Sequence, residues 1–143
     1  MKASFVAEKS ITIHAPVEAV WQALTDPEKV KEYMHGTTIE TDWSVGSPIT
    51  WSGEWKGTSY QDKGVVLAFE PKKTLSTTYW SSMSGAEDKP ENYYTVTYTL
   101  DGNDTTTTLT LQQDGNESQD AADQMAANNW GPVLEGLKAV AER

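Results

Sequence analysis

A long helical pattern at the end of the chain constrains the fold more than any other feature. From residue 119 to about residue 142, apolar side chains recur at steps of three and four residues, which is the spacing of one helix face. The stripe is formed by Met125, Ala126, Trp130, Val133, Leu134, Leu137, Val140 and Ala141. A helix with one apolar face must pack that face against another layer, so the rest of the chain has to supply the layer.

A proline lies inside this helical stretch. The pair Gly131-Pro132 falls between Trp130 and Val133 of the apolar stripe. Proline removes one backbone hydrogen bond and clashes with the preceding turn. We therefore expect the helix to be kinked near Asn128 or Asn129.

Most of the preceding chain alternates polar and apolar residues with a period of two, which indicates strands with one buried face. The expected strands are 5–13, 37–43, 49–55, 59–70, 75–80, 94–100 and 105–113. The run 65–69 is apolar throughout, so its faces cannot be assigned, and we expect a bulge near Gly64. One antiparallel sheet cannot bury its apolar face alone. The sequence therefore predicts a single α+β domain over residues 1–143, in which the sheet packs on the C-terminal helix.

Two short helices are expected between the first and second strands. Pro16 suits the first position of one of them. Asp26 is placed to cap the next, with Pro27 at its first position and Gly36 as its left-handed end. Residues 81–92 are polar and contain glycine and proline, which predicts a loop.

Composition excludes several classes of function. With 21 acidic and 11 basic residues the net charge is −10, and the basic residues are scattered, whereas phosphate binding needs clustered lysine and arginine. The chain has no cysteine, which suits a reducing compartment, and no apolar run approaches the ~18 residues of a membrane span. We expect a cytoplasmic protein with no leader segment that spans no membrane and binds no nucleic acid.

Several motifs, taken together and in order, resemble a known superfamily. They are Ile13-His14-Ala15-Pro16-Val17, Leu24-Thr25-Asp26-Pro27, Asp42-Trp43-Ser44-Val45-Gly46, Tyr60-Gln61-Asp62-Lys63-Gly64, Phe69-Glu70-Pro71, Leu109-Thr110-Leu111 and Trp130 with Val133, Leu134 and Leu137. This pattern resembles the START-related (SRPBCC) superfamily, and within it the Hsp90-ATPase-activator-like (AHSA1-type) branch. The resemblance implies the helix-grip fold, a curved antiparallel sheet wrapped around the long C-terminal helix. It also implies an apolar cavity between the two, which in such proteins holds lipids, hormones, polyketides or aromatic compounds.

The aromatic residues are the strongest indication of a ligand site within this expected fold. The candidate ligand-binding residues are Met34, Trp51, Trp55, Tyr79, Tyr98, Gln113, Trp130 and Leu134. Tyr79, Tyr98 and Gln113 would supply the few orienting hydrogen bonds that such pockets use. The alternative is that these side chains interlock into a solid core.

Catalytic chemistry finds limited support in the sequence. Only His14 and His35 are present, which excludes a multi-histidine metal site, and we expect no metal, cofactor or dedicated catalytic residue. His14 is expected to be structural, and His35 is a candidate acid or base near the cavity mouth. Asp42, Glu54 and Asp62 lie nearest the aromatic strand positions, and any that points inward would be a candidate acid or base.

The sequence therefore supports three functional hypotheses. The leading one is a non-catalytic carrier or sensor of a small apolar or aromatic molecule. A second is a cyclase or hydrolase that uses an inward carboxylate with a tyrosine. A third is a protein-interaction module in the manner of the co-chaperones, for which the loop 81–92 is the expected extra contact surface.

Overall fold

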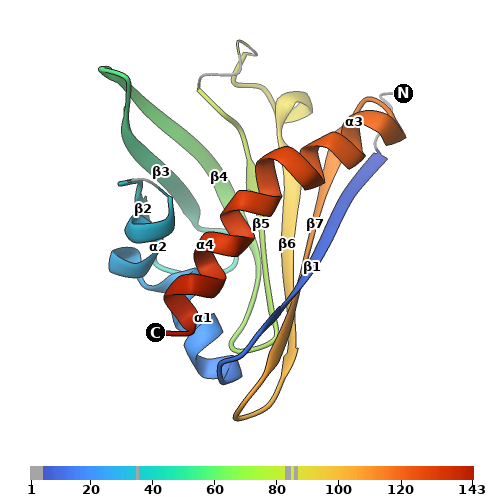
Figure 1. The fold of residues 1–143 in the computed structure, drawn as a ribbon. Coiled ribbons are helices and arrows are strands. Elements are labelled where there is room, and N and C mark those ends of the chain that lie inside the picture. Colours follow the sequence, from blue (N-terminus) through green and yellow to red (C-terminus); the bar gives the residue numbers. More distant parts are fainter. Residues whose placement is uncertain (1–4, 35, 83–84, 86) are drawn as a thin grey trace.

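A computed structural model describes residues 5–34, 36–82, 85 and 87–143, and the backbone but not the side chain of Trp55. Within these residues seven strands form one antiparallel sheet (Figure 1). The strands are β1 (Phe5–Ile13), β2 (Thr38–Glu40), β3 (Pro48–Trp55), β4 (Thr58–Glu70), β5 (Thr74–Tyr79), β6 (Tyr94–Gly102) and β7 (Thr107–Asn116). The helices are α1 (Val17–Thr25), α2 (Pro27–Tyr33), the 3-10 turn η1 (Pro90–Asn92), α3 (Gln119–Gln124), the π-helical η2 (Met125–Trp130) and α4 (Gly131–Ala141).

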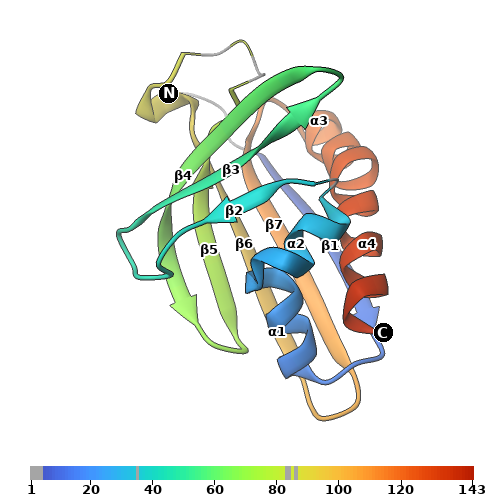
Figure 2. The ribbon, with the colours of Figure 1, turned by 90° about the vertical axis from the view of Figure 1, so that its left-hand side faces the viewer.

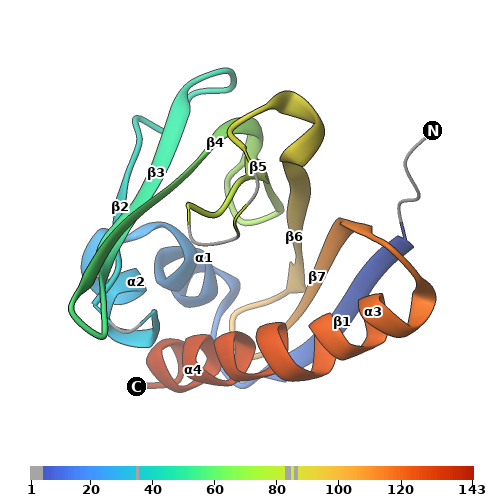
Figure 3. The same cartoon turned by 90° about the horizontal axis from the view of Figure 1, so that it is seen from above.

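The sheet curves around the C-terminal helix. Strands β2 to β7 follow one another as neighbours, and β1 joins the far edge beside β7, which gives the order β1-β7-β6-β5-β4-β3-β2. Viewed from above, the sheet forms a bent wall, and α3, η2 and α4 lie across its open side (Figure 3). Helices α1 and α2 cover one end of the same concave side (Figure 2). The predicted α+β helix-grip fold, with two short helices after the first strand, is confirmed.

The core is one cluster that takes buried residues from all seven strands and from α1, α2 and α4. Leu109 and Leu111 of β7 and Leu134 and Leu137 of α4 are fully buried. The strand period of two turns the first pair into the core, and the helical period of 3.6 turns the second pair into the same core. Burying such a leucine contributes roughly 1.5–3 kcal/mol, so these side chains help to hold the helix against the sheet.

Local signals set the boundaries of α2 as predicted, whereas Pro16, expected at the first helical position of α1, is the N-cap residue before Val17. The Asp26 carboxylate accepts a hydrogen bond from the Glu28 N–H at 3.0 Å, and Pro27 occupies the first helical position of α2. Gly36 has φ of +88° and donates its N–H to the carbonyl of Lys31, which is the left-handed end expected after such a helix.

The irregularity predicted near Asn128 or Asn129 takes the form of a π-helical stretch. Met125–Trp130 widens the helix directly before Gly131 and Pro132. Pro132 has no N–H to offer the carbonyl four residues earlier, so regular α-helical bonding fails at this turn. Because α3, η2 and α4 are contiguous, the stretch continues the helix without a break.

Three strand expectations needed correction. The strand expected at 37–43 is only Thr38–Glu40, because the Asp42 carboxylate accepts from the Ser44 N–H and turns the chain. The strand expected at 105–113 is Thr107–Asn116. The register shift expected near Gly64 falls between Val66 and Ala68.

Candidate ligand-binding site

A cavity of about 470 Å³ lies between the inner face of the sheet and the C-terminal helix. Strands β2 to β6 supply half of its lining residues, and α1, α2, η2, α4 and the connecting segments supply the rest. Cavities that hold small molecules usually measure roughly 300–1,000 Å³ and are mostly apolar with a few convergent polar groups. The core is therefore not solid in this half of the domain.

Strand register places four side chains in a row along the wall. Trp51 of β3 pairs with Asp62 of β4, and Tyr79 of β5 pairs with Tyr94 of β6. The ring centroids of Trp51 and Tyr79 are 5.0 Å apart, and those of Tyr79 and Tyr94 are 5.4 Å apart. These spacings are typical of tilted aromatic pairs. The row therefore forms one continuous aromatic surface with a carboxylate set into it.

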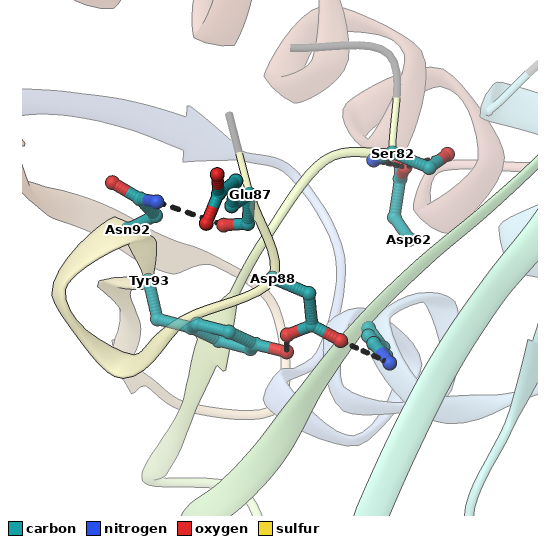
Figure 4. Close-up of polar contacts among 7 residues, drawn as sticks. Asp62, Ser82, Glu87, Asp88, Asn92 and Tyr93 are labelled. Carbon is teal, nitrogen blue, oxygen red and sulfur yellow. Dashed lines mark hydrogen bonds and ion pairs between the residues drawn. The ribbon is translucent and has the colours of Figure 1, made fainter. Parts of the chain in front are cut away.

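Asp62 is the polar centre of this row. Its side chain lines the cavity, and the residue is 7% exposed. The Tyr79 hydroxyl donates to Oδ2, while the Ser82 N–H and hydroxyl donate to Oδ1 at 2.8 and 3.1 Å. Figure 4 shows Ser82 over the carboxylate. All three partners donate, so the pocket around Asp62 is suited to a carboxylate, which only accepts.

Three tyrosines of the cavity, Tyr79, Tyr94 and Tyr98, remain protonated over the physiological range. Burial, followed by the hydrogen bond to Asp62, raises the pKa of Tyr79 far above its usual range. Burial and the negative charge of Asp62 raise the pKa of Tyr94 to about 12. Burial alone raises the pKa of Tyr98. Each hydroxyl is therefore a neutral group that can donate a hydrogen bond.

A second polar contact closes another part of the wall. The Thr37 hydroxyl donates to the carbonyl of Met34 at 2.6 Å, so the Tyr60 hydroxyl is the donor in its contact with Thr37. Gly53 allows this arrangement, because a Cβ there would lie 2.6 Å from the Tyr60 hydroxyl. At this end of the cavity the hydroxyls of Thr37 and Tyr60 therefore donate to acceptors of the protein itself.

Five of the eight predicted ligand residues line the cavity. They are Met34, Trp51, Tyr79, Tyr98 and Trp130. Leu134 is fully buried in the core and does not line it. Gln113 is also buried away from the cavity, where its Oε1 accepts from the Trp130 Nε1 at 3.1 Å and orients that indole. The side chain of Trp55 lies outside the described residues.

The candidate acids and bases differ in their exposure and in their position relative to the cavity. Asp42 is exposed, and hydrogen bonds from Ser47 and Ser44 lower the pKa of its carboxyl. Glu54 lines the cavity but is exposed, which leaves Asp62 as the inward carboxylate. His14 is at the junction of β1 and α1, where its backbone N–H donates to Glu142; His35 lies outside the described residues.

Sequence reasoning missed several lining residues. Among them are Tyr33, Thr37, Trp43, Tyr60, Tyr94 and Val133. Tyr94 was accessible from the sequence, because it shares the inward alternation of Val96 and Tyr98. Trp43 was not, because it lies beyond the end of β2 with φ of +61°, and no periodicity describes such a position.

No metal-binding cluster accompanies the cavity: among the residues that the structure describes, no group of three or more histidine, aspartate or glutamate side chains is placed to hold an ion. In the same part of the chain, no helix is long and apolar enough to cross a membrane. A cytoplasmic location stays a prediction from the sequence.

Comparison with known proteins identifies relatives of the whole domain. The family model described as Activator of Hsp90 ATPase homolog 1-like protein matches residues 14–142. A search of curated proteins finds no match. The solution structure of ChR145 from Cytophaga hutchinsonii is 43% identical, with a TM-score of 0.82, and the match covers 96% of this chain and 94% of that one.

Two further structures show how widely the fold is shared. The crystal structure of protein MLL2253 from Mesorhizobium loti is 29% identical, has a TM-score of 0.70 and is matched over 96% of both chains. The crystal structure of Ara h 8.0201 is 10% identical, has a TM-score of 0.74 and is matched over 97% of this chain and 98% of that one. At this identity the likeness concerns the fold alone. The resemblance stated from the sequence motifs is confirmed for family and fold.

Proposed function

Because this chain belongs to the Activator of Hsp90 ATPase homolog 1-like family, we propose that it binds a small apolar or aromatic molecule between the sheet and the C-terminal helix. The observation that carries the proposal is the cavity of about 470 Å³ with aromatic side chains from β3, β5 and β6 along its wall. A space of this size costs stability unless something fills it, because its lining lacks packing partners. Retention of such a space is expected where a ligand occupies it.

The proposed role is that of a carrier or sensor, and a cavity-filling variant tests it. Val133 of α4 lines the cavity, so Val133→Trp places an indole in the space that a ligand would use. The matched control is Val65→Trp, since Val65 of β4 is 38% exposed and does not line the cavity. Both variants add the same group, and only one of them adds it inside.

The assay is a thermal-shift screen of small aromatic and apolar compounds, followed by calorimetric titration of the compounds that stabilise the protein. A ligand at 100 times its Kd stabilises the folded state by about 2.7 kcal/mol, which such a screen detects. We expect binding to the native protein and to Val65→Trp and its loss in Val133→Trp. A screen with no stabilising compound, or ligands that bind Val133→Trp unchanged, would contradict the proposal.

One observation favours a second candidate, an acid–base enzyme. Asp62 lies inside the cavity with Tyr79 hydrogen-bonded to it, which is the inward carboxylate with a tyrosine that such chemistry requires. Asp62 would take a proton from the substrate and Tyr79 would hold the carboxylate in place. The test is mass spectrometry of each bound ligand after prolonged incubation: product that forms with the native protein, but not with Asp62→Asn that still binds, would support catalysis over carriage.

A further inference from the structure

We propose that the ligand carries a protonated amine on a flat apolar body, with the amine held by Asp62. This inference deepens the proposed function and rests on it. It concerns the class of molecule that the cavity accepts, and it follows from the acceptors, the rings and the charges that surround Asp62.

The described residues do not exhaust the hydrogen-bond capacity of Asp62. A carboxylate offers about four acceptor positions, two on each oxygen. Among the described residues, Oδ1 receives two donors from Ser82, whereas Oδ2 receives only the hydroxyl of Tyr79. One acceptor position on Oδ2 therefore remains for a donor from the cavity, and an ammonium group carries up to three donors.

The neighbouring cation of the protein does not compete for that position. Lys63 follows Asp62 on β4, so its side chain leaves the opposite face of the strand. There it pairs with Asp88, which also accepts from Tyr93, and its ammonium lies 5.7 Å from the Trp80 ring centroid. Figure 4 shows Asp88 beside the hydroxyl of Tyr93 and away from Asp62.

Aromatic rings flank the same carboxylate. Trp51 is its cross-strand partner and Tyr79 touches it, and both rings belong to the row described above. A cation within about 6 Å of an aromatic ring centroid is attracted by the electrons of the ring. A carboxylate beside aromatic side chains is therefore a favourable environment for an amine and an unfavourable one for an anion.

The charges of the cavity also favour a cationic ligand. Among the described residues that line it, Asp62 and Glu54 are acidic and none is lysine, arginine or histidine. The net charge of the chain is −10, which raises the local concentration of cations. An anionic ligand would be placed beside Asp62 with no positive group among the described lining residues to compensate it, and like charges brought together in this way oppose binding.

Three probes with the same apolar body separate these possibilities: 2-naphthylmethylamine, 2-naphthylmethanol and 2-naphthoate. Isothermal titration of the intact protein at neutral pH and moderate salt gives the three Kd values. We expect the amine to bind at least about tenfold more tightly than the alcohol, because a hydrogen bond to a charged group contributes a factor of roughly ten to a hundred. The carboxylate is expected to bind more weakly than the alcohol.

Three variants test whether Asp62 causes the tighter binding of the amine. Asp62→Asn should abolish the advantage of the amine over the alcohol, and retained binding of the alcohol shows that the cavity is intact. Asp42→Asn removes the same charge from an exposed position and should leave the ranking unchanged. Tyr79→Phe keeps the carboxylate and frees a second acceptor position on Oδ2, so it should preserve the amine preference even where Asp62→Asn does not fold.

The results of these titrations test the amine inference separately from the proposed ligand binding on which it rests. Equal affinity of the three probes, or tighter binding of the carboxylate, would overturn the amine inference and leave ligand binding intact. The same conclusion follows if the screen finds only neutral or anionic ligands and the amine does not bind. If no probe and no screened compound binds, the proposed function fails and this inference fails with it.

Discussion

The close approach of β4 to β5 at Gly64 makes a sharp prediction about stability. A Cβ at Gly64 would lie 1.8 Å from the carbonyl oxygen of Thr78, whereas ordinary contacts begin near 3.4 Å. Substitution with alanine must therefore move one backbone by about 1.6 Å, which exceeds the tolerance of a hydrogen bond. Both backbone bonds between Lys63 and Trp80, at 3.1 and 2.8 Å, and the 2.8 Å bond from the Val65 N–H to the Thr78 hydroxyl would be lost.

Each lost bond costs about 1 kcal/mol net, so we expect Gly64→Ala to lower the free energy of unfolding by about 3 kcal/mol. Urea unfolding followed by tryptophan fluorescence and circular dichroism measures this loss. The control is Gly131→Ala, where the added methyl group meets its nearest side-chain atom at 3.5 Å and the helix gains up to about 1 kcal/mol from propensity. A loss below about 1 kcal/mol for Gly64→Ala, or an equal loss in the control, would refute the steric argument.

Three further predictions concern single contacts. Gln113→Leu leaves the buried Nε1–H of Trp130 without its acceptor and should cost about 1–3 kcal/mol, measured by urea unfolding. Asp26→Ala removes the cap of α2 and should cost about 1 kcal/mol, whereas Asp26→Asn should cost less. The raised pKa of Tyr94, about 12 against an unperturbed 10, stabilises the folded state fully below pH 10. That stabilisation is lost as pH rises from 10 to 12, because the unfolded chain releases its proton first. Tyr94→Phe should flatten the decline in Tm over this window, and an unchanged slope would contradict the assignment.

The fold was predictable because two periodicities agree along most of the chain. Leu109 and Leu111 follow the strand period, and Leu134 and Leu137 follow the helical one. All four meet in the core. A chain in which local pattern and global packing coincide leaves few alternative arrangements.

The site was predictable only in part, for reasons of geometry. Val133 and Leu134 are successive residues on α4, about 100° apart around the helix, and only Val133 lines the cavity. The sequence stripe includes both and cannot say which side of the stripe faces the space. Gln113 was correctly placed on an inner face, but its partner proved to be Trp130, a pairing of sequence-distant residues that no local pattern encodes.

The same limit explains why Asp62 could be proposed from the sequence but not selected over Asp42 and Glu54. Its position inside the cavity depends on the register of β3 against β4, which sets it opposite Trp51. Its contact with Tyr79 also needs β5 to lie close to β4, and Gly64 permits that approach. The glycine and the carboxylate are two residues apart on one strand, so the residue that shapes the sheet also helps to bring the tyrosine to Asp62. A substitution at Gly64 should therefore disturb ligand binding and stability together.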